Sequence, residues 1–397
     1  MAVTIRDVAR AAGVSPSTVS RALSLPDMVD PTTRDRVLRV ATHLGYQPNR
    51  AARGLITGRT GNLGLLLPDL ANPFFPSMVK AIQRHAHQAD YQVLMMDTDE
   101  DPTVELALVR SLAKQVDGII LCAPRMRPQD LREAAAVRPT VLVNRTGRRL
   151  PAVTFDNHQG MHQVVTYLAG LGHTDIGFVG GPRSSWSNAE RLRGLRDAAG
   201  EAGVRLAELG NFTPNFAGGL AATDGVIVAG VTAVLAYNDL VALGLVRSLA
   251  ARGIDVPGRL SVVGIDDIAV SSMIHPGLTS LGLPTGTAGR AAVDMLLQLL
   301  SAPGPGSGSG PARTPHIDIP TELVVRETTG PVGPAPPGPK APKTSAVRLS
   351  PPSGPGSSRS RGRSPRPSPP PPNLTDPVAD AFEPRSAPTG RRRTTRR

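Results

Sequence analysis

The sequence predicts an all-α domain at the N-terminus, an α/β core of two doubly wound parallel-sheet subdomains, and a C-terminal tail without a fixed fold. Three observations lead to this prediction. Residues 1–47 contain only short helical patterns, and residues 61–330 alternate apolar strands with amphipathic helices. Residues 331–397 contain 18 prolines and a single aromatic residue. Residues 48–60 link the first two regions.

The first 47 residues predict three helices. Thr4 is a favourable N-cap for the first, and Gly13 follows that helix at a position that favours left-handed backbone. Ser15 and Pro16 start the second helix, because serine caps well and proline is tolerated at the first helical position. A third helix is expected over residues 31–45. Its inward-facing residues are expected to be Val37, Leu38, Val40 and Ala41.

Nine apolar runs in the core predict strands. They are Leu63–Leu67, Gln92–Met96, Gly118–Cys122, Thr140–Val143, Ala152–Phe155, Ile176–Val179, Ala233–Ala236, Leu260–Ile265 and Leu323–Val325. Helical patterns between them indicate βαβ units, and thus parallel sheets covered on both faces. Nine or ten strands fit two subdomains better than one. The chain is expected to cross between the subdomains near residues 157, 283 and 301–316, and the Gly/Pro/Ser-rich residues 301–312 are expected to form a flexible loop before the last strand.

The net charge of +12 is concentrated at the two ends of the chain. Residues 1–60 hold nine Arg or Lys and four Asp or Glu, and residues 331–397 hold 13 and 3. Residues 61–330, between these two ends, hold 22 Arg or Lys and 25 Asp or Glu. Basic ends around a mildly acidic middle favour terminal segments that meet nucleic acid. The tail has too little apolar surface to offset its ordering entropy, so we expect it to be disordered.

Several protein classes are disfavoured by composition. Cys122 is the single cysteine, which excludes an internal disulfide framework and a multi-cysteine metal site. The N-terminus has no apolar signal segment, and no apolar stretch reaches the ~18 residues that span a bilayer. A cytoplasmic protein without membrane contact is therefore expected. No phosphate-binding loop, nucleophile motif or metal-spaced His/Cys cluster is present, so we expect no enzyme activity, cofactor or metal.

The first two predicted helices have helix-turn-helix spacing, with a four-residue turn between them. In such motifs the second helix enters the major groove of DNA and contacts bases and phosphates. Its outer polar residues are Ser17, Thr18, Ser20 and Arg21. Taken alone, the same pattern would also suit any small three-helix bundle.

Longer segments resemble the LacI/GalR family of bacterial transcription regulators. They are VTIRDVARAAGVSPSTVSRALS from residue 3, LGYQPNRAARGL from 44, NPFF at 72–75, DGIIL at 117–121, GHTDIGFVGG at 172–181, RLRGL at 191–195, YNDLVALG at 237–244, LSVVGIDD at 260–267, PGLTSL at 276–281 and ELVVRET at 322–328. The resemblance implies a sequence-specific regulator, in most of the family a repressor, that binds a pseudo-palindromic operator as a homodimer. It also implies a core like that of type I periplasmic sugar-binding proteins.

The resemblance places DNA contacts in the helix-turn-helix and in a hinge helix over residues 49–57. The implied DNA-binding residues are Thr4, Ser15, Pro16, Ser17, Thr18, Ser20, Arg21, Asn49, Arg50, Arg53 and Leu55. Leu55 matches a leucine that wedges between bases in the minor groove at the operator centre. Gly54 lowers helix propensity by about 1 kcal/mol relative to Ala, which suits a helix that forms only on DNA. Leu55 could also be an ordinary linker hydrophobe, and Pro16 is also explained as a helix-start residue.

In the core, the resemblance implies an effector cleft between the subdomains, at the carboxyl ends of the strands. The implied effector-binding residues are Phe74, Phe75, Trp186, Arg191, Asn238 and Asp266. The aromatic members would stack on a ring, and the guanidinium would clamp hydroxyls or a carboxylate. Alternatively, the two phenylalanines are plain core residues, Trp186 lies at the surface and Arg191 is a solvated charge. Asp239 is expected to cap the helix that follows it.

A pentose, hexose, disaccharide or nucleoside would suit these side chains. Two other functions compete with the regulator. One is a sugar-binding protein outside the cytoplasm, which the N-terminal helix-turn-helix and the missing signal segment disfavour. The other is nonspecific DNA binding through the basic tail, which could contact phosphates by counterion release.

Overall fold

The computed structural model describes residues 3–24, 26–46, 59–302 and 314–333 of the 397-residue chain. Among these residues, no helix is long and apolar enough to cross a membrane. The hinge helix expected over residues 49–57, most of the loop expected over 301–312 and the tail from residue 334 onward lie outside the described residues.

The N-terminal domain contains α1 (Ile5–Ala12), α2 (Pro16–Ser24) and α3 (Pro31–His43), with a short 3-10 helix, η1 (Pro26–Met28). The Asp7 carboxylate accepts the backbone N–H of Thr4 at 2.9 Å, which secures the start of α1. Gly13 ends α1 with φ +67°, as its position predicted. The three predicted helices are confirmed.

A small apolar core joins these helices. Val8, Val19 and Val37, one from each helix, are fully buried. The prediction that Leu38 faces this core is wrong, because its side chain is 41% exposed. Each residue turns a helix by about 100°, so the neighbour of Val37 points away, while Ala41, one turn on, faces inward.

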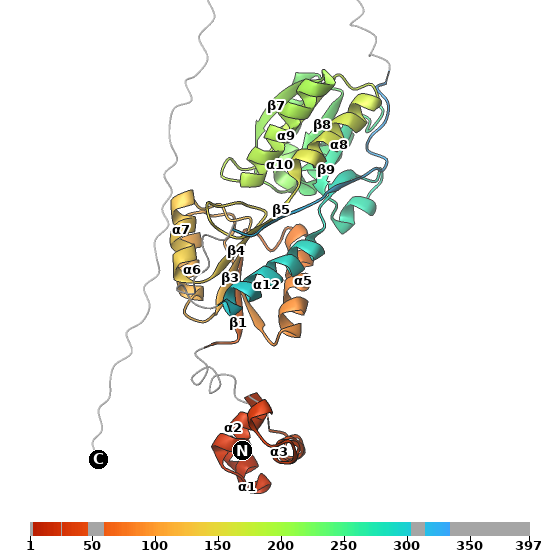
Figure 1. Cartoon of the computed structure of the whole chain (residues 1–397). Helices are drawn as coiled ribbons and strands as arrows, with labels where there is room; N and C mark the ends of the chain where they lie inside the picture. The colour runs from red at the N-terminus through yellow and green to blue at the C-terminus, as the bar shows by residue number, and fades with distance from the viewer. Residues whose placement is uncertain (1–2, 25, 47–58, 303–313, 334–397) are drawn as a thin grey trace, which may run out of the picture. The chain divides into compact units, whose positions relative to one another are not determined.

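The first core subdomain, here called the N-subdomain, has a six-stranded sheet in which every strand is parallel to its neighbours. In spatial order the strands are β11 (His316–Ile319), β5 (Ala152–Phe155), β4 (Thr140–Val143), β3 (Gly118–Cys122), β1 (Asn62–Leu67) and β2 (Gln92–Asp97). Its helices are α5 (Phe74–Gln88), α6 (Glu105–Leu112), α7 (Pro128–Val137) and α12 (Thr285–Ser301). Figure 1 shows α6 and α7 on one side of this sheet and α5 and α12 on the other.

Strand β1 shows why both faces are covered. Leu63, Leu65 and Leu67 belong to one buried apolar cluster, which contains side chains of α5 and α12. Leu66 points the other way and packs with residues of α6 and α7. Successive strand side chains alternate between faces, so a nearly continuous apolar run is what a parallel sheet with helices on both sides requires.

The second core subdomain, here called the C-subdomain, has the strand order β12 (Glu322–Val324), β10 (Thr279–Gly282), β9 (Ser261–Asp266), β8 (Ala233–Ala236), β6 (Asp175–Gly180) and β7 (Arg205–Asn211). All neighbours are parallel except β12, which is antiparallel to β10. Its helices are α8 (Asn157–Gly170), α9 (Trp186–Ala202), α10 (Phe216–Ala229), α11 (Asp239–Ala251) and the 3-10 turn η2 (Ala269–Ser272). The prediction of two doubly wound subdomains is confirmed.

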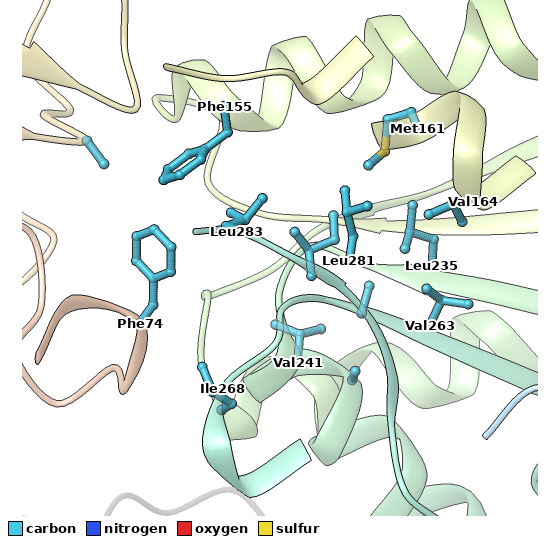
Figure 2. Packing of buried hydrophobic residues seen from close by; sticks show 14 of the residues in the cluster. Phe74, Phe155, Met161, Val164, Leu235, Val241, Val263, Ile268, Leu281 and Leu283 are labelled. Carbon is cyan, nitrogen blue, oxygen red and sulfur yellow. The ribbon is translucent and has the colours of Figure 1, made fainter. Parts of the chain in front are cut away.

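The C-subdomain core is built from aliphatic side chains on neighbouring strands. Leu235, Val263 and Leu281 come from β8, β9 and β10, and Met161 and Val164 of α8 lie against this group (Figure 2). Full burial of each such side chain is worth about 1.5–3 kcal/mol. Gly160 lets α8 approach, because a Cβ there would lie 2.6 Å from Leu281. The scarcity of aromatic residues is thus compensated by close aliphatic packing.

The chain passes between the two sheets after β5, after β10 and after β11. The third passage lies at residues 320–321, later than the expected 301–316, because β11 still belongs to the sheet of the N-subdomain. Strands β7, β10 and β11 were not predicted. Strands β7 and β11 are largely exposed at sheet edges, and β10 is a four-residue strand that begins with Thr and Ser, so none has an apolar run.

Candidate functional site

The start of α2 presents a cluster of hydroxyl groups. The Ser15 hydroxyl accepts the backbone N–H of Thr18 at 3.1 Å, which makes it the cap of this helix. The same hydroxyl lies 2.7 Å from that of Ser17 and 2.9 Å from that of Thr18. Ser15, Pro16 and Ser17 are exposed and Thr18 is half-buried. Small donors and acceptors at an exposed helix N-terminus suit contacts with bases and phosphates.

The rest of α2 separates an inner from an outer face. Val19 and Ala22 are buried in the domain core, whereas Arg21 is exposed and Ser20 is half-buried. Among the described residues Arg21 forms no ion pair, and Thr4 is exposed at the start of α1. The implied DNA contacts of the two helices therefore lie at the domain surface. The other four, Asn49, Arg50, Arg53 and Leu55, fall outside the described residues.

A narrow polar cleft lies between the two core subdomains, with a cavity volume of about 20 Å³. The N-subdomain lines it with Asn72, Phe74, Phe75, Glu100, Ala123, Arg125 and Asn144, and the C-subdomain with Arg191, Pro214, Tyr237, Asn238 and Asp266. Several of these residues end a strand or follow it within a few positions. Ligands of open α/β sheets bind at this edge, so the fold itself brings the residues together.

Phe74 and Phe75 open α5 and belong both to the core and to the cleft wall. Their rings meet edge to face with centroids 5.0 Å apart, and Phe74 also meets Phe155 at 6.2 Å. Asn72 holds the start of this helix, because its side-chain oxygen accepts the Phe74 N–H at 3.0 Å. The two interpretations of these rings, as core and as ligand contacts, are therefore compatible.

Arg191 on α9 is held rigidly at the cleft wall, with only 2% of its surface exposed. Its Nε donates to Asn157 at 3.2 Å and its Nη1 to the Tyr237 carbonyl at 2.6 Å. The guanidinium also lies 5.0 Å from the centre of the Tyr237 ring. Its remaining nitrogen, Nη2, is 3.8 Å from Asp266. The interpretation of Arg191 as a solvated charge is excluded by this burial.

Asp266 ends β9 in an unusual backbone conformation, with φ +119°. Burial raises its pKa well above the ordinary value; Arg191 opposes this rise and the neighbouring Asp239 adds to it. The carboxyl group is thus buried, and its one ion-pair neighbour among the described residues, Arg191, is 3.8 Å away. Such a group is available for hydrogen bonds to a ligand.

The predicted cap of α11 must be corrected. Asn238, not Asp239, caps α11, because its side-chain oxygen accepts the Val241 N–H at 2.9 Å. Its amide nitrogen donates to the Pro214 carbonyl at 2.9 Å, so the group orients the cleft wall. Asp239 is the first residue inside α11, and its carboxylate reaches across to the segment between β9 and β10.

Three donors meet the Asp239 carboxylate. They are the Ile268 N–H at 2.9 Å and the hydroxyls of Ser271 and Ser280 at 2.7 and 2.5 Å. Burial raises the pKa of Asp239 to about 6 in spite of these bonds. The network fixes the turn that follows Asp266.

Arg125 links the two walls of the cleft. It forms a two-pronged ion pair with Glu100, with distances of 2.7 and 3.0 Å. It also acts on Tyr237 of the opposite subdomain: burial alone would raise the pKa of this phenol, but Arg125 and then Arg191 bring it below its ordinary value. A movement of the subdomains would therefore change the surroundings of Arg125 directly.

Trp186 is half-buried at the first position of α9 and is not among the described residues that line the cleft. Its neighbour Ser185 is nearer to the site, because its hydroxyl lies 3.0 Å from that of Tyr237. The sequence does not distinguish these two positions, because they are adjacent residues at the start of one helix.

Sequence reasoning missed about half of the cleft. The unpredicted polar lining residues are Asn72, Glu100, Arg125, Asn144 and Tyr237. Asn144 directly follows β4 and Arg125 follows β3 by three residues, so a search for polar residues just after predicted strands would have found them. The side-chain oxygen of Asn144 is buried without a hydrogen-bond partner among the described residues, which makes it a candidate ligand contact.

Comparison with known proteins finds similarity over both the N-terminal domain and the core. Residues 4–49 match the family model of bacterial regulatory proteins of the lacI family, and residues 165–329 match that of the periplasmic binding protein-like domain. The transcriptional regulator DegA of Bacillus subtilis is 33% identical over 347 residues, which cover 84% of this chain and 99% of DegA. The ribose operon repressor of Halalkalibacterium halodurans is 30% identical over 328 residues, which cover 82% of this chain and 97% of that repressor.

Solved structures give the same result. The lac repressor dimer bound to operator and the anti-inducer ONPF is similar with a TM-score of 0.72 and 29% identity, covering 83% of this chain and all of that one. The complex of the regulator CelR with cellobiose is similar with a TM-score of 0.60 and 29% identity, covering 82% and 99%.

Proposed function

The chain belongs to the LacI family of bacterial regulatory proteins, and we propose that it is a homodimeric repressor whose cleft binds a neutral, hydroxyl-rich effector, a sugar or a nucleoside. As a member of this family it is a DNA-binding transcription regulator controlled by a small molecule. We place DNA recognition in residues 1–47, the hinge in 48–60 and effector binding in 61–330. The protein would act in the cytoplasm, where the chromosome lies.

The charge balance of the cleft supports this ligand class. Arg125 is neutralised by its ion pair with Glu100, and Arg191 lies 3.8 Å from Asp266, so the lining offers at most one uncompensated cation to an ionic ligand. Donors, acceptors and aromatic faces are all present. A ligand with many hydroxyls and an apolar ring face can bind donors, acceptors and aromatic faces alike. Two similar proteins agree with this ligand class, since CelR is solved with cellobiose and another relative is named ribose operon repressor.

The single observation that carries the effector assignment is Asn144. A buried amide oxygen without a partner costs free energy unless a ligand supplies a donor. It lies on the wall opposite Arg191 and Asp266, so a ligand that satisfies it would touch both subdomains. Ligand binding would thereby favour one angle between the subdomains. A bias of about 1–3 kcal/mol is enough to control operator affinity.

The C-subdomain offers a surface for a second copy. Phe216, Val270 and Met273 are exposed apolar residues, and Met273 is 75% exposed. The first two line a hollow of about 750 Å³, together with Leu243 and Ile274. Large exposed apolar areas mark interaction sites, and a twofold pairing would cover the same hollow on both copies. The lac repressor structure is a dimer as well.

The first test is capture of sheared genomic DNA with the full chain and with Leu55→Ala, followed by sequencing. We expect the unaltered protein to enrich a short palindrome and Leu55→Ala to lose most of this enrichment. Enrichment of DNA without a shared motif by both proteins would instead indicate nonspecific, electrostatic binding. Equal enrichment of one palindrome by both would exclude Leu55 as the wedge while keeping the regulator.

The effector is tested separately, by thermal unfolding with ribose, cellobiose and uridine as probes. We expect at least one probe to raise the unfolding temperature of the full chain and not that of Arg191→Ala. A rise of the same size in both would place the ligand outside the proposed cleft.

A further inference from the structure

A second pocket lies in the N-subdomain, apart from the cleft. It has a volume of about 380 Å³, within the range of roughly 300–1,000 Å³ typical of small-molecule sites. Helix α7 and the loop between β4 and β5 line it. The lining residues are Pro128, Leu131, Arg132, Arg145, Thr146, Gly147, Arg148 and Leu150. Three arginines and no acidic residue appear in this lining, and we call it the arginine pocket.

The acidic residues near the arginine pocket are paired with other arginines. Asp130 on α7 is bound by Arg127 at 2.9 Å, and Glu133 forms an ion pair with Arg110. Among the described residues neither Arg132 nor Arg148 has an ion-pair partner. The charges of Arg132 and Arg148 are therefore not compensated by an ion pair.

Arg145 is the most informative member, because it is buried and incompletely bonded. Its exposed fraction is 7%, and its Nη1 donates to the Pro124 carbonyl at 2.6 Å. Its Nε is buried without a hydrogen-bond partner among the described residues. A buried cation with an unused donor is unfavourable unless an anion or acceptor approaches it.

Glu105 is the acidic group that acts electrostatically on Arg145, but its oxygens already accept hydrogen bonds from the backbone. They accept the backbone N–H groups of Arg125 and Met126 at 2.7 and 2.6 Å. Burial lowers the pKa of Arg145; Glu105 opposes this and Arg125 adds to it. The guanidinium remains charged because arginine titrates far above neutral pH. Glu105 thus only partly balances it.

We propose that the arginine pocket is a second ligand site, which binds a small molecule carrying a phosphate group. The guanidinium fork matches two phosphate oxygens, and Arg145 and Arg148 can both face the group in the same pocket. A phosphate monoester has a charge of about −1.5 to −2 at neutral pH, which suits several unpaired arginines. The apolar residues Pro128, Leu131 and Leu150 provide contacts for the carbon part of the molecule.

The arginine pocket is close in sequence to the effector cleft. Arg145 directly follows the cleft residue Asn144 and holds the carbonyl of Pro124, which precedes the cleft residue Arg125. An anion bound by Arg145 would therefore act on the backbone next to two cleft residues, Asn144 and Arg125. The site does not depend on the identity of the effector, so either proposal can fail alone.

The turn over residues 147–150 supplies a matched control. Gly147 and Leu150 pair across this turn, and the two arginines between them are both exposed. Arg148 lines the pocket, whereas Arg149 is not among the lining residues. Arg148→Gln and Arg149→Gln remove the same charge one residue apart.

The test is calorimetric titration of the full chain with glycerol 3-phosphate, with glycerol and inorganic phosphate as comparison ligands. We expect saturable binding of glycerol 3-phosphate with a Kd of about 1 mM or tighter, weaker binding of inorganic phosphate, and none of glycerol. Arg148→Gln should weaken binding by about tenfold, the loss of one charge-assisted hydrogen-bonded contact. Arg149→Gln should change it less than about twofold, as expected for an exposed charge outside the site.

Arg145→Gln should abolish binding, and its thermal unfolding is compared with that of the unaltered chain. If this buried variant does not fold, the comparison of Arg148→Gln with Arg149→Gln still tests the proposal. Arg191→Ala should bind glycerol 3-phosphate normally, which separates this pocket from the cleft. Equal weakening by Arg148→Gln and Arg149→Gln, loss in Arg191→Ala, or no saturation would overturn the proposal. If inorganic phosphate binds as tightly as glycerol 3-phosphate, the pocket is a site for the phosphate ion alone and not for a phosphorylated small molecule.

Discussion

Helix α2 and the effector cleft hold their polar side chains in different environments. On α2, Ser17 and Arg21 are exposed; the Ser17 hydroxyl contacts that of Ser15, and Arg21 forms no ion pair among the described residues. In the cleft, Arg191 and Asp266 are buried and held by neighbours that orient them. A long DNA duplex brings its own charge to an open surface, whereas a small ligand must find its partners already in place.

The carboxyl groups of the two regions show the same contrast. In the N-terminal domain, hydrogen bonds from Thr4 and Thr32 lower the pKa values of Asp7 and Asp30, respectively, and both carboxylates are solvated. In the core, burial raises those of Asp239 and Asp266. The two pairs therefore respond to pH in opposite directions.

The largest expected effect tests this contrast in the core. The folded-state pKa of Asp239 is about 6, above its unfolded value of 3.8, so the folded state binds more protons between these values. Its contribution to stability is therefore present below pH 4 and lost as pH rises through 6. The loss amounts to about 3 kcal/mol. Urea unfolding at several pH values measures it.

Asp239→Asn is the matching variant, because it keeps the shape of the side chain and removes the titration. We expect the difference in unfolding free energy between this variant and the unaltered chain to change across pH 4 to 7. A constant difference would show that Asp239 does not titrate in this range. Asp7 and Asp30 act the other way: their stabilisation is present above their unfolded pKa and is lost as pH falls through the lower folded value.

The next effect concerns the buried fork of Arg191. Replacement by Ala leaves the oxygen of Asn157 and the carbonyl of Tyr237 without a donor and removes a cleft cation. We expect effector affinity to fall about 100-fold, equivalent to about 2.8 kcal/mol. Calorimetry with whichever probe stabilises the chain measures this loss. Arg193→Ala, an exposed arginine on the same helix that pairs with Glu190, should leave the affinity unchanged.

The smallest effect concerns an exposed arginine on the DNA-binding surface. Arg21→Gln should lower operator affinity about tenfold and reduce the slope of log affinity against log salt by about one, as for one lost phosphate contact. Arg39→Gln removes the same charge from the exposed side of α3 and should change neither value. Gel-shift titration at several salt concentrations compares them. Identical losses in both variants would mean that only net charge matters.

The same contrast explains what the sequence could predict. The helices of the N-terminal domain depend on local signals, such as the cap at Ser15 and the left-handed Gly13, so the three helices were predicted with bounds correct to within about two residues. The wrong assignment of Leu38 came from treating two adjacent residues as one face. Strands with apolar runs were found for the same reason, because period and composition are local.

The cleft depends on topology, so its lining could be found only in part. Arg125 and Tyr237 are far apart in sequence and come together because β3 and β8 end at facing sheet edges. The sequence predicted Asp239 as the cap of α11, but the cap is Asn238. Both residue types can cap a helix, and the backbone conformation determines which of the two adjacent residues is the cap. Resemblance supplied Arg191 and Asp266, and it did not exclude Trp186.

The most direct test of the account measures operator affinity with and without the stabilising probe, in the full chain and in Arg191→Ala. We predict that the probe changes the affinity of the full chain by about 5- to 150-fold and that of Arg191→Ala by less than about twofold. An unchanged affinity in the full chain, or an equal change in both proteins, would contradict control of DNA binding through this cleft.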